Sequence, residues 1–123
     1  EHTAEPRAKL VRYQVLAGNQ ILPTATVEVE VEGHRRSASA VGNGPLDAAM
    51  TAADAALGFE LSLLEMHTRA VTAGKDALAE VTVRVAHDGI ESLGQAASTD
   101  TIEATLKAYL SAVAAAREAR AAA

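Results

Sequence analysis

The stretch SASAVGNGPLDAAM, residues 37–50, decides how the rest of the chain is interpreted. Its first part alternates side chains as a strand does, and Gly-Asn-Gly-Pro then interrupts the alternation. Glycine adopts backbone angles that other residues avoid, and Pro45 favours the first turn of a helix. The stretch therefore predicts a strand, a glycine corner and a helix. Such a corner can hold an anion at the helix N-terminus, and it is also common as plain punctuation.

Three strands are predicted before the glycine corner. Residues 10–18, 24–33 and 35–41 alternate apolar and polar side chains, the middle segment most strictly as TATVEVEVEG. After the corner, apolar residues recur at helical spacing, and Gly58 is suited to end a helix. We therefore predict a helix over residues 45–57.

The second half of the chain repeats this order of elements. Three further strands and a second helix are predicted at 59–74, 77–89, 90–98 and about 99–118. Asp100, followed three residues later by Glu103, is typical of a helix start. The Ala-rich tail, residues 114–123, is expected to continue the helix.

A shift of 56 residues aligns the two halves without a gap. The matched pairs include Val15/Val71, Gly18/Gly74, Val27/Val83, Val29/Val85 and Gly33/Gly89. We interpret the chain as a single α+β domain of duplicated βββα units, about 9–58 and about 59–118. The units are expected to be related by a pseudo-two-fold axis, with the helices packed on antiparallel sheets. The alternative is a chance similarity between two strand–helix segments.

The core is expected to be thin, because apolar residues make up 49% of the chain but aromatic residues only 2%. Side chains on the inner faces of the strands and helices should be buried. These are Val27, Val29, Leu46, Met50, Val83, Val85, Leu106 and Val113.

Composition also excludes several classes of function. The net charge of −5 argues against nucleic acid or an anionic membrane as a partner. No apolar run approaches the length of a membrane span, and no cysteine is present. The four histidines are not at ligand spacing, so we expect no metal and no cofactor. We expect a cytoplasmic domain, and the missing initiator methionine suggests that it was excised from a longer chain.

The duplication suggests where a ligand would bind. Residues 42–45, at the glycine corner, correspond to residues 98–101 under the shift. Two helix N-termini would then occupy equivalent places, each with N–H donors and a nearby carboxylate, Asp47 or Asp100. This combination suits a zwitterion, since the donors bind its carboxylate and an acid binds its ammonium group.

Three motifs in order resemble the C-terminal regulatory domain of 2-isopropylmalate synthase, a domain shared in form with citramalate synthase. They are GNGPLDA at 42–48, TAGKDA at 72–77 and STDTIEAT at 98–105, followed by Ala-Tyr at 108–109. The resemblance covers roughly residues 8–115. It implies two βββα units, a homodimer, and feedback inhibition by the end-product amino acid. One departure is GQAA at 94–97, which keeps one glycine where the family usually has Gly-x-Gly.

The resemblance implies that this chain binds leucine where two copies meet and controls the catalytic domain of a synthase in leucine biosynthesis. The parent would be an acyltransferase, while this chain alone is expected to have no catalytic activity. The alternatives are an isoleucine-sensing domain of citramalate synthase and a structural dimerisation module without ligand. The expected effector-binding residues are Gly42, Gly44, Pro45, Asp47, Ala48, Ala73, Asp100, Thr101 and Ala104.

Overall fold

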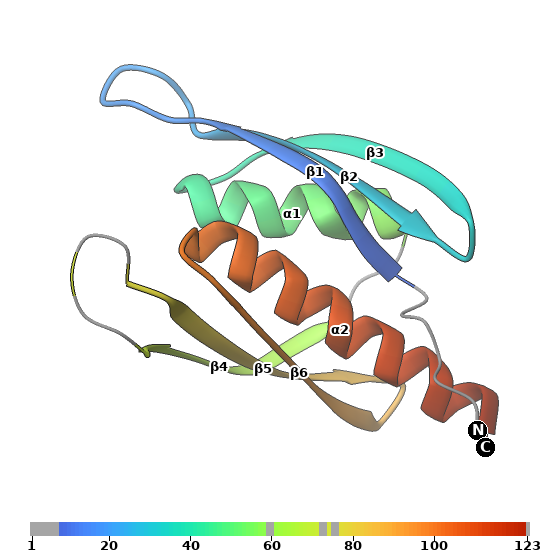
Figure 1. The fold of residues 1–123 in the computed structure, drawn as a ribbon. Helices are drawn as coiled ribbons and strands as arrows, with labels where there is room; N and C mark the ends of the chain where they lie inside the picture. Colours follow the sequence, from blue (N-terminus) through green and yellow to red (C-terminus); the bar gives the residue numbers. More distant parts are fainter. Residues whose placement is uncertain (1–7, 59–60, 72–73, 75–76, 123) are drawn as a thin grey trace.

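The computed structural model describes residues 8–58, 61–71, 74 and 77–122 (Figure 1). Its elements occur in the predicted order, with three strands and a helix in each half. They are β1 (Ala8–Leu16), β2 (Thr24–Val31), β3 (His34–Val41), α1 (Pro45–Leu57), β4 (Ser62–Ala70), β5 (Ala79–His87), β6 (Ile90–Ser98) and α2 (Thr101–Ala122). The predicted α+β fold of two βββα units is confirmed.

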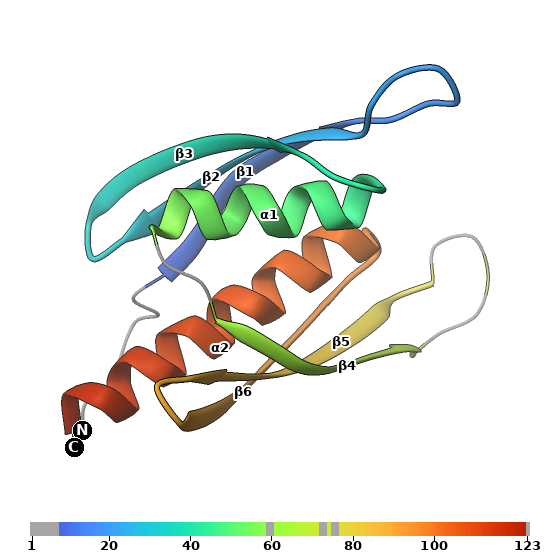
Figure 2. The ribbon, with the colours of Figure 1, turned by 180° about the vertical axis from the view of Figure 1, so that it is seen from behind.

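The two halves pack against each other through their helices. Each half forms an antiparallel three-stranded sheet, in the orders β1-β2-β3 and β4-β5-β6. The helices lie between the two sheets, and both begin at the same end of the molecule (Figures 1 and 2). A two-fold axis parallel to the helices would relate such halves, as the duplication predicts.

The turns between the second and third strands show how closely the halves match. Glu32 and Gly33 have φ angles of 51° and 84°, and Asp88 and Gly89 have φ angles of 53° and 79°. Two successive residues with positive φ form the tight hairpin turn that suits the twist of antiparallel strands. The same turn therefore recurs 56 residues later, at the matched glycines.

The first strands match at a different spacing, which corrects the gapless alignment. Leu10 pairs with Val29 and Leu63 with Val85, so Leu63 takes the place of Leu10 only 53 residues later. Both strands also have a bulge at the next residue. The loop after β4 is therefore three residues longer than the loop after β1, and the proposed matches Val15/Val71 and Gly18/Gly74 are wrong. Hairpin loops tolerate such insertions at little cost.

The core is built from valines of the central strands and small residues of the helices. Of the eight side chains predicted to be buried, the structure buries six: Val27, Val29, Val83, Val85, Leu106 and Val113. Helix α2 lies very close to its sheet at Gly94, where an added Cβ would meet the carbonyl oxygen of Ala108 at 2.0 Å. Close backbone approach thus replaces the bulk that the chain lacks.

The prediction is wrong for Leu46 and Met50, which are only half-buried. Both lie on α1 and face strand β4 across an open cleft. The two halves differ here, because α2 packs on β1 whereas no described residue of α1 comes within 8 Å of β4 between Cα atoms. As a result, all nine residues of β4 are exposed.

Candidate functional site

The first corner, residues 42–48, has a helix start that no side chain caps. Gly44 is the extended residue before the helix, and no side chain accepts a hydrogen bond from the first turn. The Asp47 carboxylate instead accepts a hydrogen bond from the backbone N–H of Asn43, 2.9 Å away. The N–H groups at the start of α1 therefore remain available to an anion.

Gly42 permits the shape of this corner. A Cβ at Gly42 would lie 2.4 Å from the backbone nitrogen of Ala48, whereas a Cβ at Gly44 would meet nothing within 4 Å. The N–H of Gly42 donates to the carbonyl of Pro23 at 3.0 Å, which joins the corner to strand β2. Gly42 is thus needed for close packing, and Gly44 leaves open space in front of the helix.

The second corner, residues 98–104, is closed by its own side chains. Asp100 Oδ1 accepts hydrogen bonds from the backbone N–H groups of Ile102 and Glu103, at 3.0 and 3.2 Å. Its other carboxylate oxygen accepts a hydrogen bond from the Tyr13 hydroxyl of β1. The Ser98 hydroxyl accepts from the backbone N–H of Asp100 at 3.0 Å. These bonds occupy the groups that would otherwise hold a ligand.

Protonation follows from the Tyr13–Asp100 contact. The hydrogen bond from Tyr13 lowers the pKa of Asp100, and the backbone N–H donors act in the same direction. Burial, together with the neighbouring carboxylate, raises the pKa of Tyr13. At neutral pH the contact therefore joins a neutral phenol to an ionised carboxylate.

A cleft of about 370 Å³ opens beside the first corner, between α1 and β4. We call it the α1–β4 cleft. Its walls combine apolar side chains with two carboxylates and one phenol, namely Leu46, Asp47, Met50, Thr51, Asp54, Leu61, Leu63, Met66 and Tyr109. Tyr109, from α2, donates to Asp54 Oδ1 at 2.5 Å. The cleft has the size and mixed lining of a small-molecule site.

The structure separates the predicted site residues into groups. Gly42, Gly44, Pro45 and Asp47 form the first corner, and Asp47 also lines the α1–β4 cleft. Asp100 and Thr101 belong to the second corner, at the same end of the molecule (Figure 2).

The three predicted alanines do not line the cleft. Ala48 and Ala104 are completely buried on the inner faces of the two helices. Ala73 lies outside the described residues.

Sequence reasoning missed the β4 side of the cleft. Leu63 and Met66 lie on the face of β4 that faces α1, with the bulged Leu64 between them. The bulge breaks the alternation of apolar and polar residues, so the segment gives no clear strand pattern. The adjacent leucines at a bulge were the available signal.

Among the described residues, no group of three or more histidine or acidic side chains could hold a metal ion. No helix in the part of the chain that the structure describes is long and apolar enough to cross a membrane.

Comparison with known proteins gives a consistent result. The chain matches the family described as the LeuA allosteric (dimerisation) domain over residues 1–116. It is similar to 2-isopropylmalate synthase of Aquifex aeolicus (strain VF5), with 42% identity over 105 residues, which cover 85% of this chain and 20% of the relative. For the synthase of Ruminiclostridium cellulolyticum the identity is 40% over 114 residues, 92% of this chain and 22% of the relative. For that of Methanocaldococcus jannaschii it is 40% over 102 residues, 83% and 20%. The chain thus spans about a fifth of the length of these relatives.

Proposed function

We propose, from the finding that this chain belongs to the LeuA allosteric (dimerisation) domain family, that it is the leucine-sensing regulatory domain of a 2-isopropylmalate synthase. It would bind leucine as a homodimer and control a catalytic acyltransferase domain in leucine biosynthesis. The synthase itself would be a cytoplasmic enzyme, while residues 1–123 alone carry out no catalysis.

The observation that carries this proposal is the α1–β4 cleft beside an uncapped helix N-terminus. A free amino acid needs a partner for its carboxylate, another for its ammonium group and an apolar wall. The first-turn N–H groups of Leu46 and Asp47 supply the first. The Asp47 carboxylate supplies the second. Asp100, the other carboxylate considered, is already engaged with Tyr13 and the start of α2.

The apolar wall suits a branched side chain. Leu46 and Met50 of α1 face Leu63 and Met66 of β4 across the cleft. Enclosing an isobutyl group among them would contribute about 2 kcal/mol. Isoleucine has the same number of carbons, so it remains the second candidate. The Gly-x-Gly departure at 94–97 lies on β6, away from the residues that line this cleft.

A second copy of the chain would complete the site. Strand β4 is at the edge of its sheet, and Leu63, Leu64 and Met66 are 45%, 43% and 37% exposed. Exposed apolar residues on an unpaired edge favour association. We propose that two copies meet along β4, which would close the cleft and link leucine binding to the arrangement of the dimer. A dimerisation module that binds no ligand would use the same face.

Calorimetric titration of leucine into the purified chain tests this proposal. Met66→Trp should fill the cleft and abolish binding, while Leu93→Trp, on exposed β6 surface away from the cleft, should bind as the unaltered chain does. If neither leucine nor isoleucine binds, the sensor proposal fails and the structural module remains. Sedimentation of the same samples tests the dimer separately. Thiol release from acetyl-CoA with a 2-oxo acid should be absent, and its presence would contradict the regulatory assignment.

A further inference from the structure

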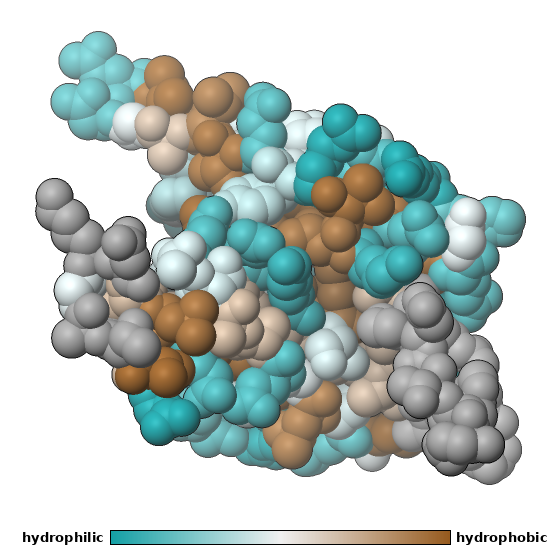
Figure 3. Space-filling view, in the orientation of Figure 1, coloured by the Kyte–Doolittle hydropathy of each residue, from teal (hydrophilic) through white to brown (hydrophobic). Residues whose placement is uncertain are grey.

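The fold contains a second cleft, between the start of β1 and the middle of α2. It has a volume of about 250 Å³ and is lined by Ala8, Lys9, Leu10, Lys107, Leu110 and Ser111. We call it the β1–α2 cleft. Figure 3 shows apolar surface between these two elements with hydrophilic residues around it. Its size is somewhat below the range of about 300–1,000 Å³ for drug-sized ligands, so it suits a small molecule.

The duplication relates this cleft to the α1–β4 cleft. Each lies between the helix of one half and the first strand of the other. Leu10 corresponds to Leu63 by strand register. Lys107 stands in α2 where Thr51 stands in α1, because the two helices begin at corresponding residues. The fold thus presents two versions of one cleft.

The two versions carry opposite charge. The α1–β4 cleft has the carboxylates of Asp47 and Asp54 and no lysine or arginine among its lining residues. The β1–α2 cleft has Lys9 and Lys107 and no acid among its lining residues. At the position of Asp54 it has Leu110, which is buried and forms an apolar floor.

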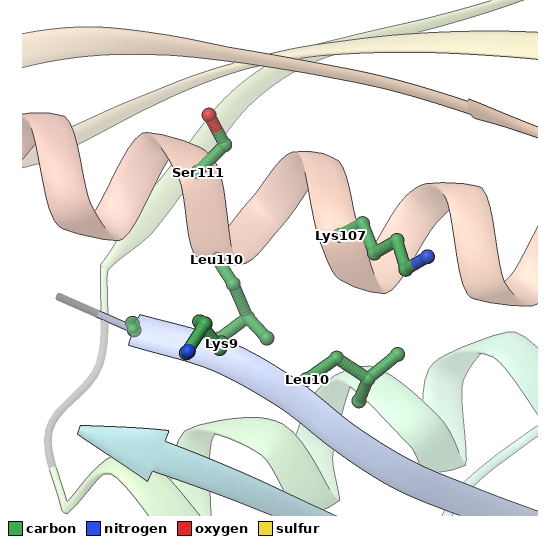
Figure 4. Close-up of a pocket in the computed structure, with 6 residues that line it drawn as sticks. Lys9, Leu10, Lys107, Leu110 and Ser111 are labelled. Carbon is green, nitrogen blue, oxygen red and sulfur yellow. The ribbon is translucent and has the colours of Figure 1, made fainter. Parts of the chain in front are cut away.

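The lysines lie at the edge of this apolar floor. Figure 4 shows Leu110 reaching from α2 toward β1, with the amine groups of Lys9 and Lys107 on opposite sides of it. Lys107 is 48% exposed and forms an ion pair with Glu103 at 2.8 Å. Exposed lysines keep their stems on apolar surface and can swing their ammonium groups toward an anion. Even with Glu103 included, the positive charges are in excess.

We propose that the β1–α2 cleft is a second ligand site, which takes a small monocarboxylate with a branched aliphatic tail. The tail lies on Leu10 and Leu110, and the carboxylate lies between the lysine ammonium groups. The ligand has no ammonium group, since this cleft offers no acid among its lining residues for one. A fatty acid and a 2-oxo acid share this chemistry. The inference stands on the charge of this cleft and does not require that leucine binds elsewhere.

Nuclear magnetic resonance titration of the full chain tests the proposal with charge-matched probes. 4-Methylpentanoate supplies the anion, 4-methyl-2-oxopentanoate adds the oxo group, and 3-methylbutylamine carries a similar tail on a cation. We expect the acids to shift the backbone amide signals of Leu10, Leu110 and Ser111, with a Kd in the millimolar range, and the amine to leave them unchanged. A stronger effect of the oxo acid identifies the 2-oxo acid as the better ligand, and equal effects identify the fatty acid chemistry as sufficient.

Two variants separate charge recognition from general apolar binding. Lys9→Gln together with Lys107→Gln should weaken binding of the acids by about fivefold, as expected for exposed ion pairs. Arg12→Gln, which removes a cation elsewhere on β1, should leave the affinity unchanged. Amide signals that do not respond to the acids, that respond equally to the amine, or that respond equally in the double lysine variant would overturn the proposal.

Discussion

The two helix corners share a backbone plan and differ in what fills them. At the second corner Tyr13 of β1 reaches Asp100, which also caps α2. By strand register and helix start, the corresponding residues at the first corner are Met66 and Gly44. Neither can form such a hydrogen bond through its side chain. Duplication thus gave one corner that is held shut by its own side chains and one that is left open beside a cleft.

The difference extends to the strands. Helix α2 covers β1, whereas α1 leaves β4 exposed. One half is therefore internally complete, and the other presents an apolar edge and an uncapped helix. We infer that binding and association use the second arrangement, while the first holds the domain together. The variants below alter one half or give it the features of the other.

The largest effect is expected from Gly94, where α2 approaches its sheet most closely. Gly94→Ala would place a Cβ 2.0 Å from the Ala108 carbonyl oxygen and force the helix away. We expect a loss of about 3 kcal/mol of unfolding free energy, at the upper end of overpacking costs. Urea denaturation measures it.

The matched control is Ala38→Gly, because Ala38 is the counterpart of Gly94 in the first half. It should cost only about 1 kcal/mol, as a glycine inside a strand does. Equal costs for the two variants would show that α2 is not held as closely as the structure has it.

A double swap tests whether the Tyr13–Asp100 contact is what closes a corner. Gly44→Asp with Met66→Tyr should build that contact at the first corner and cap α1. A ligand at about 100 times its Kd stabilises a protein by about 2.7 kcal/mol, and we expect this stabilisation by leucine to disappear. Thermal unfolding with and without leucine measures the effect. A double variant that leucine stabilises as before would contradict the assignment.

Removing the contact at the second corner should cost less. Tyr13→Phe deletes a hydrogen bond to a charged group, and we expect a loss of about 2 kcal/mol in unfolding free energy at pH 7. Urea denaturation at constant pH measures this loss. Met66→Leu, at the corresponding position, should be close to neutral.

The same contact predicts an acid dependence of stability. Because the pKa of Asp100 is lower in the folded state than its ordinary 3.8, its contribution is complete above that value. It should be lost as pH falls further, through the folded pKa. The raised pKa of Tyr13 acts at the other end, since its contribution is complete below pH 10 and is lost at more alkaline pH. Tyr13→Phe should flatten both slopes, and unchanged slopes would show that other groups cause them.

The smallest effect is expected for the ion pair between Arg117 and Glu32, 2.6 Å apart. It joins the end of α2 to the turn between β2 and β3. Both side chains are partly exposed, so we expect Arg117→Gln to cost about 0.5 kcal/mol, and less at high salt. Thermal unfolding at two salt concentrations would detect it.

The sequence predicted the repeated architecture because its signals are local. Alternating valines and the turn at Gly33 and Gly89 determine strands and hairpins within a few residues of each other. The same periodicity could not show that Leu46 and Met50 face a gap, because that depends on how far α1 lies from β4. It also could not place the three-residue difference between the hairpin loops, since only strand register reveals it.

The candidate site was predicted in part for the same reason. Gly42, Gly44 and Asp47 are neighbours in sequence, and a strand–glycine–helix pattern identifies them. Tyr13 and Asp100 are far apart in the chain, so no local pattern reveals that one occupies the other. Residues on β4 became candidates only when the fold brought them opposite α1.

The most direct test of this account uses the two methionines of the chain, Met50 and Met66, which both line the α1–β4 cleft. Labelling methionine methyl groups with carbon-13 gives one signal from each, and Met50→Leu and Met66→Leu assign them. Titration with leucine should shift both signals together and saturate at one leucine per chain. Saturable leucine binding that leaves both methyl signals unmoved would place the effector elsewhere and contradict the account.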